Sequence, residues 1–543
     1  MSAAARGHAG CAGAAPRTGR GILENVAARV LYFHNTIDTH CLLMTALGLG
    51  ALGALSMLGW VDGIAWATLA RPAAILHAGA LVAALLLALK WCDFFPPILL
   101  AAGPVAVVLS PLAGGRTDLV LWVLGVNLAL FVVSHMMLFG GPYVVIFGAW
   151  SSPLRGLWYS LFTLAPTTAS FWICQFCTNV VTFAVLLRPE PSRPAGLLFL
   201  GSIAAAVVAA RLVRPRSRMS PTFLPPPGPP VVRRVLLLSV DGLSLNLMRR
   251  ARTPFFDRLA REWASAPAGA VTVYRALTNP AFASMMTGVP PEVHTMRDNN
   301  LGNRIAVEGL PDYVPARIYG SIHMRHFAKP HWDVRVVPIT REGFATDDVL
   351  VRWLLEDLEG APDLRLFVVD LSTVDMTAHA FGARTRHYIR AIEETDRRLD
   401  RLFAEMERRG VLDDTTVILS SDHGQSCLDH SFLLNDDEKY VPLVLCGAGI
   451  RRGATLGFRP SITDFAPTIA WLLGVPYPGA CRARVLAEAI ESAPVPDRAG
   501  LDAGEAAVAA SSSAGAARSI AAAASPTDTA ARPVAAPAHG TAR

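Results

Sequence analysis

Charged residues are scarce in the apolar runs of the first half of this chain, and cysteines are scarce in the second half. A pump or an ion pathway usually needs ionisable residues within its membrane spans, so the first scarcity disfavours a transporter. Only three cysteines lie beyond residue 220, at Cys427, Cys446 and Cys481. Their number is odd and their spacing is irregular, which disfavours a domain built on disulfides.

Two other features are missing. Residues 1–41 lack a compact apolar core followed by a small-residue cleavage site, so we expect no signal peptide. No repeat of solenoid period is present.

Residues 1–220 contain 14 Lys and Arg against 6 Asp and Glu, a net charge of +8, which leaves a net charge of −2 for the rest of the chain. Because nucleic-acid binding needs clustered basic residues, we expect no nucleic-acid partner for the second half.

The first half of the chain is strongly apolar. Hydrophobic residues make up 52% of the whole sequence and its mean hydropathy is +0.38, with the excess lying almost wholly before Arg211. Six runs approach or exceed the ~20 residues that cross a bilayer. They lie at 42–60, 73–92, 95–113, 118–140, 157–187 and 195–213. We therefore expect an all-α transmembrane region of about six helices at 42–213; five or seven remain alternatives because two long runs can be divided differently.

Arginines flank this region on both sides. Arg17, Arg20 and Arg29 precede the first expected span. At and beyond the end of the last span lie Arg211, Arg214, Arg216 and Arg218. The loop between the first two expected spans has only Arg71. By the positive-inside rule both flanks lie in the cytoplasm, which requires an even number of spans. The sequence therefore predicts a multi-pass protein of the cell membrane, with the lipid bilayer as a partner, a cytoplasmic N-terminal segment at 1–41 and a cytoplasmic second half.

A proline-rich segment separates the two halves. Residues 214–230 include PTFLPPPGPP, which is typical of a stiff, extended spacer. From residue 231 to about 490, strand-like runs alternate with helical patterns, such as the one at 388–403. This alternation predicts an α/β domain with a mainly parallel sheet sandwiched by helices. Residues 491–543 are rich in Ala, Ser, Pro and Gly, and we expect a disordered tail there.

Acidic residues and histidines follow several strand-like runs of the predicted domain. Asp241 follows the run 235–240, Asp370 and Asp375 follow 366–369, and Asp422 with His423 follow 417–419. In an open α/β sheet, groups just beyond the carboxyl ends of strands converge on one crevice. Residues far apart in the sequence are therefore expected to share one site.

The local patterns of these residues allow metal binding as well as simpler interpretations. Asp375 and His379 are four residues apart, so on a helical turn both can hold one ion, although such a pair is often a surface hydrogen bond. The adjacent Asp422 and His423 could also be a capping pair. For His430, the only observation that supports metal binding is its position just before the next strand. Together these ligands favour two divalent ions. Oxygen and nitrogen ligands without a thiolate favour zinc, with manganese or iron as alternatives.

Thr278 begins the segment TNPAFASMMTG. Asn279 before Pro280 predicts a helix that starts with Pro280 at its first position and stops at Gly288. A hydroxyl at this place lies beside the unpaired backbone N–H groups at the positive end of a helix, where a phosphate can bind. Thr278 is therefore a candidate nucleophile, and a helix-capping role is the alternative.

The order and text of these motifs resemble the alkaline phosphatase superfamily and, within it, the type I phosphodiesterase and nucleotide pyrophosphatase branch. The resemblance covers about residues 232–486 and rests on VLLLSVDG, LTNPAFASMMTG, LFVVDLSTVDMTAHAFG and VILSSDHGQ, which occur in the family's order. It implies that one zinc ion is surrounded by Asp241, Thr278, Asp422 and His423 and that the other is held by Asp375, His379 and His430. It also implies that Thr278 is the nucleophile.

The sequence departs from the family pattern at two places. The family often has Asn three residues after the nucleophile to contact a phosphoryl oxygen, whereas this chain has Ala281, and Asn279 or Asn299 could supply the contact instead. The segment before His430 is shorter and plainer than usual. The cysteine nucleophile motif of sulfatases is absent, which counts against sulfate esters.

These observations predict a membrane-anchored two-metal phosphodiesterase or phosphohydrolase that acts through a phospho-threonine. Two divalent ions ~4 Å apart would activate the threonine hydroxyl and stabilise the leaving oxygen. The expected substrate is a phosphodiester or pyrophosphate, with lipid-linked compounds included because the domain is joined to the spans by a short segment. The alternatives are a phosphoethanolamine-type or phosphoglycerol-type transferase, and a multispan transporter or scaffold carrying an inactive phosphatase-like domain.

Overall fold

The computed structural model describes residues 193–213, 217–297, 299, 304–321, 323–337, 346–425, 430 and 436–493, together with short stretches between residues 46 and 130. Compact packing divides the chain into two units, Met1–Pro494 and Val495–Arg543. The expected N-terminal segment at 1–41 and almost all of the expected tail at 491–543 lie outside the described residues.

Helix α9 (Arg193–Val213) coincides with the last expected span. The other expected spans lie largely outside the described residues. Among the helices that the structure describes, none combines the length and the apolar character needed to cross a bilayer.

The second half of the chain contains a seven-stranded sheet in the order β2-β9-β7-β1-β6-β4-β5. Five strands are parallel to one another: β1 (Arg234–Val240), β4 (Ala316–Gly320), β5 (Asp333–Val336), β6 (Leu366–Leu371) and β7 (Thr415–Ser420). Strand β9 (Leu443–Gly447) pairs antiparallel to β7, and β2 (Ala264–Ser265) pairs antiparallel to β9. The predicted α/β fold with a mainly parallel sheet is therefore confirmed.

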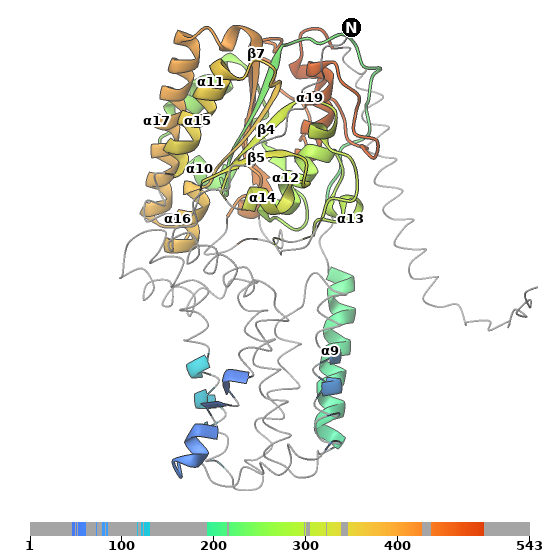
Figure 1. Cartoon of the computed structure of the whole chain (residues 1–543), viewed down its shortest axis with the longest axis vertical. Coiled ribbons are helices and arrows are strands. Elements are labelled where there is room, and N and C mark those ends of the chain that lie inside the picture. Colours follow the sequence, from blue (N-terminus) through green and yellow to red (C-terminus); the bar gives the residue numbers. More distant parts are fainter. Residues whose placement is uncertain are drawn as a thin grey trace, which may run out of the picture. The chain divides into compact units, whose positions relative to one another are not determined.

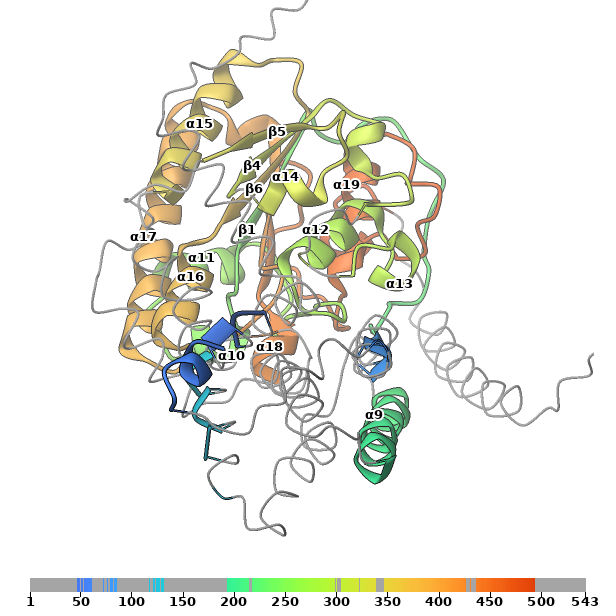
Figure 2. The same ribbon diagram turned by 60° about the horizontal axis from the view of Figure 1, so that its bottom comes forward.

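Helices cover both faces of this sheet, and the two views in Figure 1 and Figure 2 both show this arrangement. One face carries α12 (Thr278–Thr287), α13 (Pro291–His294), α14 (His323–Phe327) and α19 (Phe465–Leu473). The other carries α10 (Leu245–Met248), α11 (Pro254–Glu262), α15 (Thr346–Gly360), α16 (Thr373–Phe381) and α17 (Arg386–Arg408). Successive residues of β1 point to opposite faces of the sheet. Leu237 is buried in the core under the first group of helices, and Leu236 is buried in the core under the second. Because both faces are buried, the central strands are apolar almost throughout.

The remaining elements are short. Strands β3 (Ala270–Val271) and β8 (Tyr440–Val441) form a separate pair, and α18 (Asp436–Lys439) leads into β8. Four 3₁₀ turns complete the described part of this half: η4 (Leu310–Asp312), η6 (Leu412–Asp414), η7 (Ile462–Asp464) and η8 (Ala487–Ala489).

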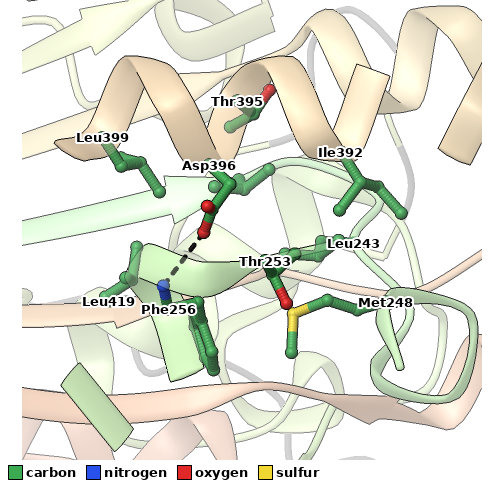
Figure 3. A pocket seen from close by; sticks show the side chains of 10 residues that line it. Leu243, Met248, Thr253, Phe256, Ile392, Thr395, Asp396, Leu399 and Leu419 are labelled. Carbon is green, nitrogen blue, oxygen red and sulfur yellow. Dashed lines mark hydrogen bonds between the residues drawn. The ribbon is translucent and has the colours of Figure 1, made fainter. Parts of the chain in front are cut away.

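Helix α17 also organises its neighbour α11. Thr253 precedes α11 but makes no side-chain capping bond. Instead, Asp396 of α17 accepts hydrogen bonds from the backbone N–H groups of Phe255 and Phe256, at 3.1 and 2.9 Å. Figure 3 shows this carboxylate beside a small cavity whose lining is mostly apolar, including Met248 and Leu399. The lining contains none of the predicted metal ligands, so this cavity is not part of the predicted site.

Residues 217–230, which we call the strap, form hydrogen bonds with the folded domain. The hydroxyl of Ser220 donates to Asp464 at 2.6 Å, and that of Thr222 donates to the carbonyl of Arg482 at 2.5 Å. Tyr477 donates to the carbonyl of Pro225 at 2.6 Å. Phe223 also forms a parallel bridge with Arg484: its N–H donates to the carbonyl of Ala483 at 3.4 Å, and its carbonyl accepts from the N–H of Val485 at 2.9 Å. Prolines lack a backbone N–H and cannot donate to a strand ladder, so the neighbouring hydroxyl contacts supply the other attachments.

Candidate active site

The ends of three adjacent strands bring the predicted ligands together. Asp241 directly follows β1, Asp375 lies in the first turn of α16 after β6, and Asp422 with His423 follows β7. Because β1 lies between β6 and β7, these strand ends are neighbours in the sheet. All four side chains are buried.

The turn after β1 allows a close approach between two of these strand ends. Gly242 has φ +69°, and a Cβ atom on it would lie 2.7 Å from Oδ1 of Asp375. The phenol of Tyr388 donates to the Gly242 carbonyl at 2.6 Å and accepts from the N–H of Ser244 at 3.1 Å. A side chain at position 242 would therefore displace a predicted metal ligand as well as strain the backbone.

His423 presents a bare ring nitrogen to two carboxylates. Its Nδ1 lies 3.1 Å from the carbonyl of Gly424, which must accept a proton, so Nδ1 is the protonated nitrogen. Nε2 then carries a lone pair and lies 3.2 Å from Oδ2 of Asp422 and 3.5 Å from Oδ1 of Asp241. Within the described part of the chain, none of these three buried atoms has a hydrogen-bond partner. Acceptor atoms that face one another without a proton fit a cation between them.

A second group contains Asp375, His379 and His430. Nε2 of His379 lies 3.3 Å from Oδ2 of Asp375 and 3.3 Å from Nε2 of His430, which is 3.6 Å from Oδ1 of Asp375. Nδ1 of His430 forms a hydrogen bond with the carbonyl of Ala276. That bond leaves Nε2 of His430 to face the other two residues, as in a histidine that binds a metal.

Asp375 takes part in both groups. Its carboxylate, with His379 and His430, offers ligand atoms that all lie within 4.8 Å of one another, and the same holds for Asp241, Asp375 and His423. The rings of His423 and His430 are stacked with their centroids 3.7 Å apart. The two groups therefore form one continuous ligand cluster rather than two separate sites.

Burial and mutual charge shift the pKa values in this cluster. Burial, followed by the charge of Asp375, raises the pKa of Asp422 to about 7. Burial and then the charge of Asp422 raise the pKa of Asp241, and burial lowers the pKa of His423. For Asp375, burial opposes ionisation, but His379 and His430 outweigh it and lower the pKa. Cations in this cluster would hold the carboxylates ionised, so metal binding would release protons.

Thr278 is the first residue of α12 rather than its cap. Leu277 is extended and holds the N-cap position without a side-chain hydrogen bond. The prediction that Asn279 caps the helix and that Pro280 is its first residue is therefore wrong. The backbone N–H of Asn279 is instead bound by Oδ1 of Asn299 at 2.9 Å. The predicted stop at Gly288 is confirmed, with φ +70°.

The loop before α12 runs beside the ligand cluster. The hydroxyl of Thr272 donates to the carbonyl of Asp422 at 2.5 Å. Four residues later, the carbonyl of Ala276 bonds with His430. Thr278 follows two residues after that contact, at the positive end of the α12 dipole, where anionic groups are stabilised.

Sequence reasoning did not assign roles to three residues of this region. Asp370 lies within β6 rather than after it, is fully buried, and has no hydrogen-bond partner for either oxygen in the described part of the chain. Burial and then the charge of Asp422 raise its pKa. Gln425 donates from Nε2 to Oδ1 of Asp375 at 2.5 Å, and Gly242 makes the close approach described above. In the sequence, all three residues lie within or next to the strand-end motifs, and this position could have identified them as candidates.

The family model for type I phosphodiesterase / nucleotide pyrophosphatase matches residues 235–308 and 310–441. Curated relatives match shorter segments. Multifunctional alkaline phosphatase superfamily protein PehA of Trinickia caryophylli is 41% identical over 106 residues, which are 18% of this chain and 20% of the relative. Arylsulfatase K of Danio rerio is 30% identical over 126 residues, 20% and 24% of the two chains. Phosphopentomutase of Symbiobacterium thermophilum is 36% identical over 93 residues, 17% and 22%.

Solved structures with related chains were also found. An inactive murine ectonucleotide pyrophosphatase / phosphodiesterase 5 in complex with AMP has a TM-score of 0.38 and 12% identity, covering 45% of this chain and 96% of that one. Lipoteichoic acid synthase LtaP from Listeria monocytogenes has a TM-score of 0.37 and 13% identity, covering 48% and 77%.

The family model and the curated relatives together support an alkaline phosphatase superfamily domain of phosphodiesterase and pyrophosphatase type at residues 235–441. The chain spans about a fifth of the length of the curated relatives that it matches. The superfamily prediction is thus confirmed for this domain, whereas the metal-binding and catalytic roles of individual residues stay predictions.

Proposed function

We propose that this chain is a metal-dependent phosphoric diester hydrolase of the nucleotide pyrophosphatase and phosphodiesterase type. The observation that carries the proposal is the buried cluster in which Asp375 belongs to two groups of mutually close ligand atoms. In this cluster Oδ1 of Asp241, Oδ2 of Asp422 and Nε2 of His423 face one another without hydrogen-bond partners in the described part of the chain. A purely structural cluster would be expected to satisfy such atoms, since buried unpaired polar groups are costly.

The donor atoms fit two divalent ions, with zinc favoured over manganese or iron because imidazole nitrogens and carboxylate oxygens occur together. One ion would be held by Asp241, Thr278, Asp422 and His423, and the other by Asp375, His379 and His430. Asp375 would also contact the first ion, because its carboxylate lies close to ligand atoms of Asp241 and His423. When bound, two such ions supply positive charge that stabilises an in-line displacement at phosphorus. Asp370 adds a fourth buried carboxylate near these ligands, so the local charge also favours two divalent cations.

The residues of the chain would carry out the displacement in two steps. Oγ1 of Thr278 loses its proton and forms a bond to phosphorus while the bond to the leaving oxygen breaks, and the leaving oxygen takes up a proton. This step gives a phosphoryl ester of Thr278 that keeps the other substituent of the diester, and it releases an alcohol or phosphate. A water oxygen then displaces Oγ1 and regenerates the hydroxyl. The positive end of α12 stabilises the phosphoryl oxygens during both steps.

The substrate class follows from this chemistry and from the apolar first half. A phosphodiester or pyrophosphate fits the site, and lipid-linked compounds are included because the apolar residues precede the domain closely. A transferase would use the same cluster, with an alcohol in place of water in the second step. The complete ligand cluster argues against a scaffold with an inactive domain.

The purified full-length chain tests this function. After removal of metal with a chelator and reconstitution with zinc or manganese, about two ions per chain should be retained. Hydrolysis of a chromogenic phosphodiester should follow the metal content. Product analysis with an added alcohol distinguishes hydrolysis from transfer. Negligible metal content, or full turnover by the metal-free chain, would exclude the proposed site.

We further propose that the apolar region anchors the protein in the cell membrane and that the catalytic domain faces the cytoplasm. The support is the apolar composition and the arginines on both flanks. A cysteine introduced in the tail after Ser492 should react with an impermeant reagent only after the membrane is permeabilised. The unmodified chain is the control for its native cysteines. Labelling in intact cells would put the domain on the other side.

A further inference from the structure

The loop from Thr272 to Leu277 is held at every second residue before it reaches α12. The contacts at Thr272 and Ala276 come from Asp422 and His430, which belong to the ligand cluster. The middle contact, at Tyr274, comes from outside the cluster. Its backbone N–H donates to Oγ of Ser217 at 3.0 Å, and the same hydroxyl lies 3.4 Å from the Tyr274 carbonyl, to which it donates.

Ser217 is the first described residue of the strap. The strap continues over the domain through Ser220, which donates to the buried Asp464. Asp464 in turn accepts from the backbone N–H groups of Ser461 and Arg484, at 2.9 and 3.2 Å. Further along, the N–H groups of Val231 and Val232 both donate to the Leu472 carbonyl. Ser217 is therefore attached to a segment that is itself bonded to several elements of the domain.

We propose that Ser217 is a positioning residue for Thr278. This inference rests on the proposed function, because it assumes that Oγ1 of Thr278 attacks phosphorus. Ser217 holds both backbone groups of Tyr274, and Thr278 follows four residues later at the start of α12. Without the Ser217 hydroxyl, the backbone N–H and carbonyl of Tyr274 would lose these two hydrogen bonds, and the middle of the loop would be less firmly fixed beside the ligand cluster. The strap supplies the third point that defines its path.

The proposal has a consequence for the rest of the chain. Helix α9 ends at Val213, four residues before Ser217. Ser217 therefore contacts the loop that carries the proposed nucleophile 17 residues before β1 begins at Arg234. The placement of Thr278 is thus coupled to the segment that links the two halves.

Replacement of Ser217 tests this coupling in the full-length chain. Ser217→Ala removes the hydroxyl, and we expect kcat on a chromogenic phosphodiester to fall by about 10- to 100-fold, since small displacements of reacting groups have effects of this size. KM and metal content should change little, because the ligand cluster stays intact. Ser217→Thr keeps the hydroxyl and should restore most of kcat. Thr222→Val removes a strap hydroxyl that donates to the carbonyl of Arg482 rather than to the loop, and it should leave kcat unchanged.

Hydrogen exchange supplies a measurement that needs no turnover. The amide of Tyr274 is protected by Ser217, so amides at residues 272–277 should exchange faster in Ser217→Ala than in wild type or Thr222→Val. Unchanged exchange and unchanged kcat in Ser217→Ala would overturn the positioning role. An equal loss of kcat in Thr222→Val would also overturn it, because general loosening of the strap would then be sufficient. If the wild-type chain shows no phosphodiester turnover, the proposed function fails, whereas the exchange result still decides whether Ser217 orders the loop.

Discussion

Thr278→Ala should reduce hydrolysis of a chromogenic phosphodiester by roughly 10³-fold or more, as expected when a nucleophile is removed. The variant should nevertheless keep most of its metal. A hydroxyl contributes less to binding a divalent ion than carboxylates and imidazoles do, and six other ligands remain. Steady-state kinetics and metal analysis on the same preparation check both parts of this expectation.

Thr278→Ser is the matched control because it keeps the attacking oxygen and loses only a methyl group. It should retain measurable turnover, and rapid acid quench should trap a phosphoryl ester on the introduced serine that still carries the second substituent of the diester. Thr278 is the first residue of α12 and Leu277 holds the cap position, so loss of a capping bond does not explain a large effect in the alanine variant. Equal activity in the two variants would mean that water attacks phosphorus directly.

Asp375→Ala should remove both ions and abolish turnover, whereas His379→Ala should remove only one ion. The difference follows from the cluster, in which Asp375 belongs to both groups of ligand atoms and His379 to one. Deleting an anionic ligand leaves each cation undercoordinated. Native mass spectrometry of the full-length chain measures the number of ions in each variant.

Asp400→Ala provides the control for the Asp375 experiment. Asp400 lies on the exposed side of α17 and pairs with Arg258 at 2.8 Å. Exposed ion pairs contribute little to stability, so this variant should keep both ions and full activity. Two ions retained by Asp375→Ala would show that the cluster binds metal without its shared carboxylate, and the proposed arrangement of ligands would be wrong.

The fold could be predicted from the sequence because the central strands are buried on both faces. Their apolar runs and the helical patterns between them indicate a mainly parallel α/β sheet. The antiparallel strands β2 and β9 were not predicted as such. Their pairing depends on contacts between residues about 180 positions apart, which no local pattern records.

In the candidate site, too, some features follow from short sequence patterns and others depend on contacts between distant residues. The residue types of the ligands follow from the strand-end motifs, since carboxyl ends of parallel strands converge. The membership of Asp375 in both groups depends on the strand order β6-β1-β7 and on the close approach at Gly242. The start of α12 was predicted two residues too late: the N–H of Ala281 donates to the carbonyl of Leu277, so the helix begins at Thr278. The N–H of Asn279 is bound by Asn299, 20 residues further along the chain.

The sequence by itself determined the α/β class, the chemistry of the ligands and the candidate nucleophile, because each depends on residue type and short-range spacing. Only the tertiary structure decided that the ligands form one continuous cluster, that Asp370 lies inside a strand, and that the proline-rich strap is bonded to the domain. Proline content alone indicates stiffness and extension, whereas attachment depends on hydroxyl partners such as Tyr274 and Asp464, which lie 57 and 244 residues away from Ser217 and Ser220.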